Sequence, residues 1–488
     1  MTYFIIGMII LVGGGFVYGH YCEKVFGPDD RKTPAVAIAD GVDYVAMPKW
    51  KNMLIELLNI AGTGPVLGPI QGILFGPVAF LTIPIGCVIA GSMHDYFSGM
   101  ISMRNDGAQI PKLVKKYLGN ALHNIYLVVI FILMLLVVSV FVYTPGDLLA
   151  HDILGFDPKS SAIWVIYGCI FIYYICSTIF PIDVIIGRIY PIFGAILLIT
   201  AVGIFGGILL DGGANLHNLT EAKGLFDIHP KGQVYLPAFF ITVACGILSG
   251  FHSTQASLIS RTVKSEKEGR QTFYNMMLVE GFIAMSWAGG AMIIMNRGLG
   301  DPNATLMVGI TAKTFMGKFG GLLAILGVVV LPITSGDTAM RSLRLMLGER
   351  FNIDQKSAKN RVLLTVGLFI PALIVLIIAK TNAEGFGILW RYFGWTNQFV
   401  SLFMLATITV YLRLHGKNYL VGLIPGMFYT FVVSSYILNA KIGFNLDALL
   451  GFKGYQVSYI VAAVLTVLFA ACAIKSADKK AKNPEMLK

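Results

Sequence analysis

The chain has 488 residues, of which 56% are hydrophobic and 13% are charged, and its mean hydropathy is +0.74. Soluble domains carry about 25% charged residues, so this chain lacks the polar side chains to cover a globular surface. The composition excludes a disordered protein, a secreted disulfide scaffold and an ordinary cytosolic enzyme, and it indicates an integral membrane protein. The six cysteines fall mostly within apolar runs without metal-ligand spacing, so we interpret them as reduced, buried thiols.

Thirteen segments are candidates to cross a bilayer, which takes about 20 apolar residues each. We therefore expect an all-α integral membrane protein with about 13 transmembrane helices. Ten segments are continuous: 3–19, 78–100, 124–144, 162–180, 188–210, 274–296, 361–379, 395–412, 418–438 and 455–474. Three more are long enough but interrupted: 54–77, 235–258 and 320–342.

The basic residues predict the orientation of the chain. When successive loops are assigned to alternate sides, 27 of the 37 Lys and Arg residues fall on one side and 10 on the other. Cytoplasmic loops carry the excess of Lys and Arg, so we expect the N-terminus outside and the C-terminus in the cytoplasm. The net charge of +11 is then a consequence of topology and does not indicate a nucleic-acid partner.

Two of the interrupted spans carry breaks rich in Gly, Pro and small polar residues. Span 54–77 contains Ala61-Gly-Thr-Gly-Pro65, and span 235–258 contains Gly246-Ile-Leu-Ser-Gly-Phe-His-Ser-Thr-Gln255. The two spans lie five apart, and an odd offset makes equivalent helices run in opposite directions. This pattern predicts an inverted five-plus-five repeat of the leucine-transporter-like kind, with a broken first helix in each half. The alternative is two unrelated glycine-rich packing helices.

The predicted repeat divides the chain into four parts. An extra N-terminal helix lies in 1–20, the first five-helix repeat in 54–210, the second, inverted repeat in 235–413, and two extra helices in 418–474.

Ionisable side chains inside the spans are costly to bury and are therefore candidate functional residues. His252 lies in the second break, where it binds a ligand or a proton, or is hydrogen-bonded to a neighbouring helix. Glu280 lies inside the next span, where it either pairs with a base or titrates during transport. Asp95, next to His94, lies near the predicted cytoplasmic end of its span, where we expect an interfacial salt bridge.

We expect the substrate to bind between the two breaks, where broken helix ends direct backbone N–H groups at a carboxylate. The candidate substrate-binding residues are Gly62, Thr63, Gly64, Ser249, Gly250, Phe251, His252 and Gln255.

Transporters with this repeat place a sodium site between the first broken helix and the third helix of the second half. By similarity to those transporters, we expect the carbonyls around Ala61–Gly64 to face the hydroxyls of Thr334 and Ser335, with Asp337 close by. Asp337 and Arg341, four residues apart, form a helix salt bridge in the alternative interpretation. A proton is the other possible coupling ion, and Glu280 is a candidate to carry it. Na⁺ and H⁺ both remain open.

Six stretches make the chain similar to the carbon starvation protein A family of bacterial peptide and pyruvate transporters. They are Arg31-Lys-Thr-Pro-Ala35, Asp40-Gly-Val-Asp-Tyr-Val45, Ala61-Gly-Thr-Gly-Pro65, Gly250-Phe-His-Ser-Thr-Gln255, Pro332-Ile-Thr-Ser-Gly-Asp-Thr-Ala339 and Phe393-Gly-Trp-Thr-Asn-Gln398. The resemblance implies a secondary transporter of the inner membrane that imports peptides or pyruvate when carbon is scarce. The chain departs from many members at Ile55 and Glu56, where they carry two histidines, and at His94, where they carry glutamine.

The function we predict is secondary active transport of a small molecule across the lipid bilayer, without a cofactor or a bound metal. His20 and Cys22 could ligate a metal, but we interpret this lone pair as structural or exposed. The alternative function is a channel or a membrane-embedded sensor. A channel would favour a ring of pore-lining groups and a sensor a cytoplasmic domain, and neither pattern is present. A membrane enzyme would need a nucleophile with a base or a metal set, which the sequence also lacks.

Overall fold

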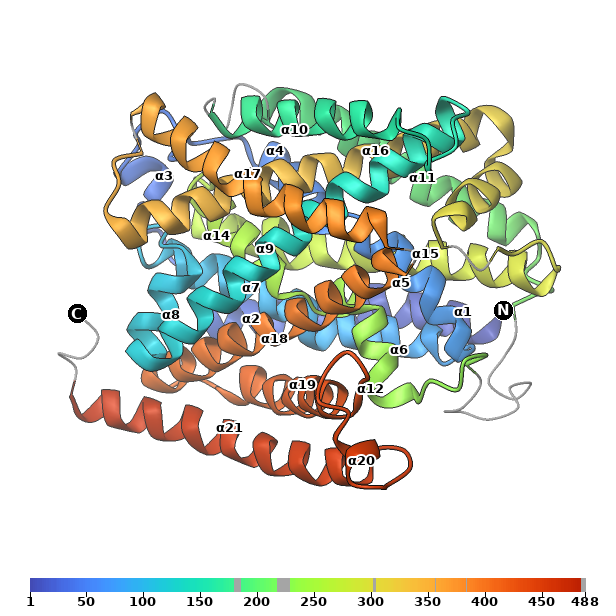
Figure 1. Ribbon diagram of the computed structural model, residues 1–488. Helices are drawn as coiled ribbons and strands as arrows, with labels where there is room; N and C mark the ends of the chain where they lie inside the picture. The colour runs from blue at the N-terminus through green and yellow to red at the C-terminus, as the bar shows by residue number, and fades with distance from the viewer. Residues whose placement is uncertain (180–185, 217–228, 302–303, 356, 383, 484–488) are drawn as a thin grey trace.

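The computed structural model describes residues 1–179, 186–216, 229–301, 304–355, 357–382 and 384–483, with the backbone alone at 178–179 and 186–191. This part of the chain is helical and contains no β-strand. Most helices lie side by side along one direction, with α1 beginning at one end of the bundle and α21 ending at the other (Figure 1). The helices are α1 (Thr2–Ile9), α2 (Gly15–Phe26), α3 (Pro34–Ala37), α4 (Lys49–Ala61), α5 (Gly64–Gly72), α6 (Ala79–Gly86), α7 (Ser92–Met103), α8 (Ile110–Leu118), α9 (Asn120–Leu148), α10 (Ile163–Ile179), α11 (Ile186–Leu210), α12 (Tyr235–Thr242), α13 (Ala244–Ile247), α14 (Gly250–Ile259), α15 (Asn275–Asn296), α16 (Ala304–Phe351), α17 (Ala358–Thr381), α18 (Gly385–Leu414), α19 (Leu420–Asn439), α20 (Leu446–Leu449) and α21 (Gln456–Lys482).

Within the described residues, nine helices are long and apolar enough to cross a membrane, or ten if the bent pair α4 and α5 counts as one span. Thirteen were predicted. The three remaining predicted segments, 78–100, 162–180 and 235–258, are helical but do not meet the same measure. The last of them is divided into three short helices, and residue 180 lies outside the described residues.

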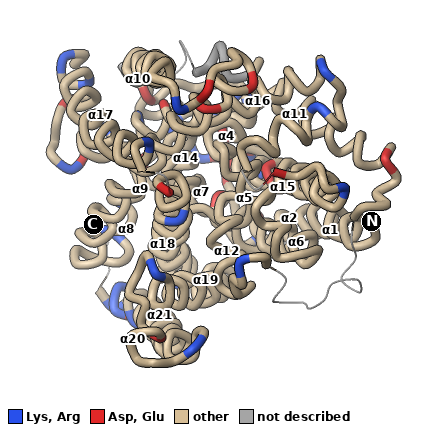
Figure 2. Tube along the Cα trace, turned by 45° about the vertical axis from the view of Figure 1, so that its right-hand side comes forward, with Lys and Arg blue, Asp and Glu red and all other residues tan. Residues whose placement is uncertain are grey.

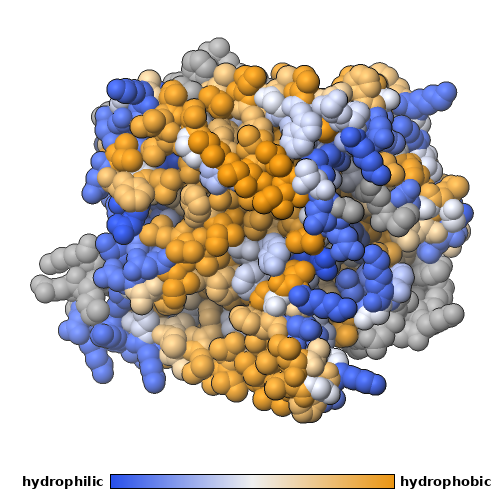
Figure 3. All heavy atoms as spheres, in the orientation of Figure 1, coloured by the Kyte–Doolittle hydropathy of each residue, from blue (hydrophilic) through white to orange (hydrophobic). Residues whose placement is uncertain are grey.

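The outer surface of the bundle is apolar between two polar ends. Figure 3 shows hydrophobic residues across the middle of one face and hydrophilic residues gathered toward its two ends. On α21, Ile460, Val464 and Val467 are all more than half exposed. Figure 2 shows most Lys and Arg segments at the periphery and a few acidic segments inside the bundle. A surface of this kind suits contact with lipid, and the chain is a multi-pass membrane protein.

The first broken helix changes direction between α4 and α5, where the chain bends by 47°. Gly62 ends α4 with a φ of +46°, a conformation that residues with a Cβ rarely adopt. Pro65, in the first turn of α5, has no backbone N–H, so it starts a helix readily and cannot continue the preceding one. The local sequence therefore accounts for this break.

The second broken helix is interrupted twice, at Val243 and at Leu248–Ser249. Leu248 and Ser249 are extended, with ψ angles of 126° and 124°, so α14 begins as a separate helix at Gly250. Backbone groups freed in this way need partners, because lipid supplies none.

The two broken helices cross at their breaks. Helix α4 packs on α14, and α5 packs on α12 and α13. A Cβ atom built on Gly64 would lie 2.0 Å from the Cβ of Cys245, so only glycine permits this approach. The other long helices surround the crossing, and α19 and α21 pack together next to α18. The crossing agrees with the predicted broken helices, while the relation of the two halves as inverted repeats stays a prediction.

Candidate functional site

Asn397 on α18 braces the second break. Its Oδ1 atom accepts hydrogen bonds from the backbone N–H of Phe251 at 2.8 Å and from the Ser249 hydroxyl at 3.0 Å. Its Nδ2 group donates to the thiol of Cys245 at 3.2 Å. The next residue, Gln398, donates to the carbonyl of Phe240 at 2.7 Å. Two adjacent amides of one continuous helix thus supply partners that the broken helix lacks.

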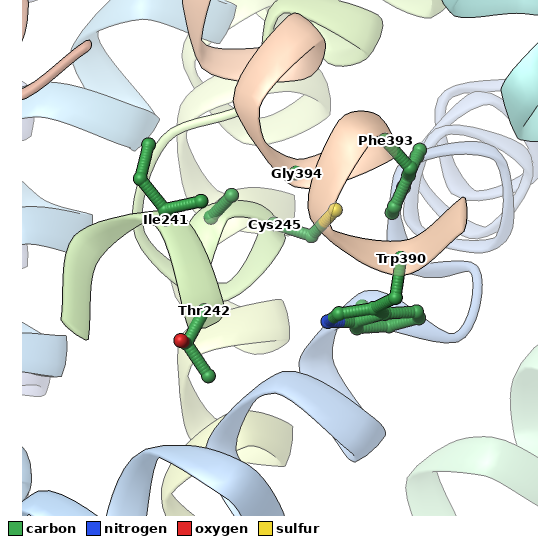
Figure 4. A pocket seen from close by; sticks show the side chains of 8 residues that line it. Ile241, Thr242, Cys245, Trp390, Phe393 and Gly394 are labelled. Carbon is green, nitrogen blue, oxygen red and sulfur yellow. The ribbon is translucent and has the colours of Figure 1, made fainter. Parts of the chain in front are cut away.

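A narrow crevice lies where the two broken helices meet α18. Gly64 comes from the first break, Cys245 from the second, and Trp390 and Phe393 from α18. Figure 4 shows the side chains of Cys245, Phe393 and Trp390 around this space. The crevice is too tight to admit a water molecule, so the bundle is closed here.

Two hydrogen-bonding groups next to the crevice have no partner among the described residues. They are the hydroxyl of Thr63, which is fully buried, and the indole N–H of Trp390. An unpaired buried polar group costs about 1–3 kcal/mol, so it is a natural place for a ligand to bind.

The predicted substrate-binding residues of the first break contact aromatic side chains. A Cβ on Gly62 would lie 2.6 Å from the ring of Phe141 on α9. The ring of Phe251, in the second break, packs edge to face on the same ring, with 6.1 Å between the ring centroids. A Cβ on Gly250 would lie 2.4 Å from the carbonyl oxygen of Asn397. Because Gly62 and Gly250 have no Cβ atom, the neighbouring helices approach their backbones closely.

Gln255 lies one turn beyond His252 on α14 and is fully buried. Its amide donates to Thr254 at 3.0 Å, and its carbonyl oxygen has no partner in the described part of the chain.

A histidine pair converges on one carboxylate in the centre of the bundle. The Nδ1 atom of His252 lies 2.9 Å from Oδ2 of Asp95, and the Nδ1 atom of His94 lies 2.9 Å from Oδ1 of the same residue. All three side chains are fully buried. The expected interfacial salt bridge at Asp95 is therefore wrong, because α7 packs against α14 and turns this carboxylate inward.

Two glutamates complete this buried cluster. The Nε2 atom of His252 lies 3.7 Å from a carboxylate oxygen of Glu280 on α15. Glu56 on α4 is also fully buried, and neither of its oxygens has a hydrogen-bond partner among the described residues. Glu56 was noted in the sequence only as a departure from the family pattern. An ionisable residue six positions before a predicted break was the signal that could have singled it out.

The predicted coupling-ion residues do not come together in one site. Ser335 on α16 donates a 2.7 Å hydrogen bond to the carbonyl of Leu58, one turn before Ala61 at the end of α4. Thr334 donates to Leu331 within its own helix and lines an apolar cavity of about 480 Å³ between α10, α11 and α16. Glu280 contacts His252 instead and belongs to the buried cluster.

Asp337 and Arg341 face groups outside α16. Asp337 accepts hydrogen bonds from Tyr173 and Ser177 of α10, at 2.8 and 2.9 Å. Arg341 donates to Asp43, in the loop that precedes α4, at 3.0 Å. Both side chains therefore have partners on other segments of the chain.

Asp43 is almost fully buried next to two arginines, Arg341 at 3.0 Å and Arg344 at 3.7 Å. Burial alone would raise the pKa of this carboxyl. The positive charges of the two guanidinium groups outweigh that effect, and the pKa of Asp43 is held below its ordinary value. This ion pair ties the loop before α4 to the end of α16.

Solved structures of low sequence identity share this fold. MhsT, in complex with L-phenylalanine, superposes with a TM-score of 0.58 at 10% identity, covering 87% of this chain and 99% of that one. A manganese transporter of Eremococcus coleocola superposes with a TM-score of 0.57 at 12% identity, covering 91% and 99%. The fold and its broken helices define a membrane protein of the leucine-transporter-like class.

The chain belongs to the family of the carbon starvation protein CstA, whose sequence model matches residues 1–207, 143–299 and 288–435. An uncharacterized membrane protein of Haemophilus influenzae is 40% identical over 59% of this chain and 89% of its own length. The peptide transporter CstA of Escherichia coli is 24% identical over 89% of this chain and 80% of the relative. The pyruvate/proton symporter BtsT of Escherichia coli is 25% identical over 59% of this chain, which spans about half of that relative (48%). The family and its named members make this chain a membrane transporter.

Proposed function

We propose that this protein is a secondary active transporter that imports a small organic nutrient with a free carboxylate, a short peptide or pyruvate, across the bacterial inner membrane. The substrate binds where the two broken helices cross, and transport proceeds by alternating access. The N-terminus lies outside and the C-terminus in the cytoplasm. This function needs no cofactor and no enzymatic step.

One observation carries the proposal: Gly64 and Cys245, from the two breaks, meet Trp390 of α18 around a closed crevice. Binding sites at the midplane of such transporters are built from discontinuous helices, whose ends present backbone groups to the substrate. The unpaired Thr63 hydroxyl and Trp390 indole N–H supply two more donors for a carboxylate. Because the crevice is closed, the helices around it must separate to admit the substrate.

The named relatives support the class of substrate. They are a peptide transporter and a pyruvate/proton symporter, and both kinds of substrate carry a carboxylate. The name of the Haemophilus influenzae relative gives no substrate, so the choice between peptide and pyruvate rests on experiment.

Counterflow in proteoliposomes tests this function. Vesicles are loaded with unlabelled alanyl-alanine or pyruvate, and entry of the same labelled compound is followed without any ion gradient. We expect internal substrate to accelerate entry of label, because a carrier exchanges substrate across alternating states. A channel conducts without this acceleration, and a sensor gives no entry, so either result would refute the proposal.

Two tryptophans of α18 form a matched pair of variants. Trp390→Ala removes a donor and an aromatic wall of the crevice, and the loss of about 1–2 kcal/mol should lower exchange about tenfold at limiting substrate. Trp395 stacks on Phe399 and donates to the carbonyl of Val433 on α19, away from the crevice. Trp395→Ala should lower exchange less than Trp390→Ala does, because the contacts that it loses are with Phe399 and α19 and not with the crevice. Equal losses in both variants would place the substrate elsewhere.

A further inference from the structure

Five ionisable side chains without exposed surface lie on four helices that pack on one another. They are Glu56 of α4, His94 and Asp95 of α7, His252 of α14 and Glu280 of α15. Their helices pack on one another, α14 against α4 and α7, and α15 against α4 and α7. None of these five residues lines the crevice or takes part in the hydrogen bond between Ser335 and Leu58.

The contacts of Asp95 determine which atom of His252 faces Glu280. Asp95 receives the Nδ1 atoms of two imidazoles, both at 2.9 Å, and a carboxylate is an acceptor for two N–H groups. With Nδ1–H of His252 donated to Asp95, its Nε2 atom is left to gain or lose a proton. Nε2 faces the carboxyl of Glu280 at 3.7 Å, beyond hydrogen-bond distance, and neither group has a hydrogen-bond partner among the described residues. One proton can therefore reside on either member of this pair.

Glu56 adds a second carboxyl without a hydrogen-bond partner in the described part of the chain. The charged side chains near enough to act on it are Asp95 and Glu280, both acidic. The thiols of Cys87 and Cys245 are the other titratable groups near Glu280. The cluster contains three carboxyl groups and two imidazoles, and no described Lys or Arg belongs to it. An isolated buried carboxylate is so unfavourable that the group takes up a proton instead.

We propose that Glu56, Glu280 and the Nε2 atom of His252 form a proton-binding site that couples proton entry to uptake of the substrate. In the closed bundle Glu56 carries one proton, and the pair of Glu280 and His252 shares another. Asp95 and His94 are positioning residues, because Asp95 orients the His252 ring and His94 holds Asp95. The coupling role, as distinct from the proton site, rests on the proposed transport function.

The place of the cluster on the two broken helices explains how protons and substrate are linked. His252 is the third residue of α14, just after the second break, and Glu56 precedes the first break at Gly62 by six residues. Glu280 and Asp95 lie on α15 and α7, which are continuous at these positions. When the broken helices move to open the crevice, which is lined by α5, α13 and α18, α4 and α14 move with them and separate His252 from Glu280. The proton on that pair then exchanges with the side that has opened.

Infrared spectroscopy of the purified protein tests the site without any substrate. We compare wild type, Glu56→Gln, Glu280→Gln and the control Glu23→Gln, whose carboxylate pairs with Arg270 at the edge of the bundle. At neutral pH we expect a carbonyl band from protonated carboxyl groups that is weaker in the first two variants and unchanged in the control. A wild type without this band, or a band unchanged in both variants, would overturn the proton site.

Proteoliposomes containing a pH-sensitive dye test the coupling with labelled alanyl-alanine and pyruvate. Without Na⁺, we expect an inward proton gradient to drive accumulation and acidify the lumen. Glu56→Gln and Glu280→Gln should retain counterflow, which also shows that they fold, and should lose at least about tenfold of gradient-driven accumulation. Accumulation that persists in both variants, or that follows a Na⁺ gradient instead, would overturn the coupling. If wild type shows no counterflow, the transport function has failed, and the infrared result still decides the proton site.

Discussion

Ser335 on α16 donates its hydroxyl hydrogen to the carbonyl of Leu58 on α4, at 2.7 Å. The bond joins α16 to the first broken helix, one turn before its break. This is the region where similarity to transporters with a leucine-transporter-like repeat predicts a sodium site. In the closed bundle the hydroxyl and the carbonyl bind each other.

We predict that replacing the two hydroxyls changes the rate of uptake and not its ion requirement. Thr334→Val with Ser335→Ala removes a tie between α16 and α4, worth about 1 kcal/mol, so uptake should fall several-fold. Uptake by wild type and variant should be unchanged when choline replaces Na⁺. A variant that needs more Na⁺ than wild type would show that the hydroxyls bind sodium. Thr314→Val, at an exposed hydroxyl of the same helix, is the control.

Asn397 should matter for stability because it serves two groups of the second break. Asn397→Ala leaves the backbone N–H of Phe251 and the hydroxyl of Ser249 buried without their acceptor, at a cost of about 1–3 kcal/mol. We expect a lower unfolding temperature in detergent and slower counterflow. Asn296→Ala, at an exposed surface amide, should leave both unchanged. An unaltered unfolding temperature in Asn397→Ala would mean that the break does not need this brace.

The close approach of the two breaks at Gly64 can be tested with a destabilising variant and a second substitution that should restore stability. In Gly64→Ala the new methyl group would lie 2.0 Å from the Cβ and 2.5 Å from the thiol of Cys245, so the crossing must open. Overpacking of this kind costs about 1–3 kcal/mol, and we expect a loss of both stability and uptake.

The double variant Gly64→Ala with Cys245→Gly removes both clashing atoms, and the next neighbour is then 3.5 Å away. It should recover much of the stability that Gly64→Ala loses. Gly13→Ala, where a Cβ meets nothing within 4 Å, is the control. The same loss in the single and double variants would contradict the proposed crossing, and unfolding temperatures of the purified variants decide between the outcomes.

The ion pair of Asp43 predicts a pH dependence of stability. Because the folded-state pKa of this carboxyl is lower than its ordinary value, its ionised form stabilises the folded protein. The contribution is complete above the unfolded-state pKa of about 3.9 and is lost as the pH falls through the lower folded-state pKa.

Asp43→Asn leaves the Arg341 and Arg344 guanidinium groups without their shared carboxylate, so we expect about 3–5 kcal/mol of destabilisation at neutral pH. The difference from wild type should shrink as the pH falls below about 4. Thermal unfolding at several pH values measures both effects. Asp30→Asn, at an exposed carboxylate paired with Lys267, should show neither, and a pH-independent loss in Asp43→Asn would contradict an ionic role.

The sequence by itself determined the membrane class and the positions of the two breaks. Both depend on properties that act over one or a few turns: apolar length, the missing N–H of Pro65, and the positive φ that Gly62 adopts. These features work within a single helix, so they can be predicted without knowing which helices are neighbours.

Only the tertiary structure decided which polar side chains share one site. Asp95 was predicted at an interface, and it lies in the core against His252, which is 157 residues away in the chain. Glu56 was not selected as a site residue, and Asn397 was noted only within a family motif, yet one joins the buried cluster and the other braces a break. Hydropathy gives the depth of a residue along its helix but not the direction in which it faces. That direction depends on how α4, α7, α14 and α18 are rotated and packed against one another, and these contacts join residues distant in sequence.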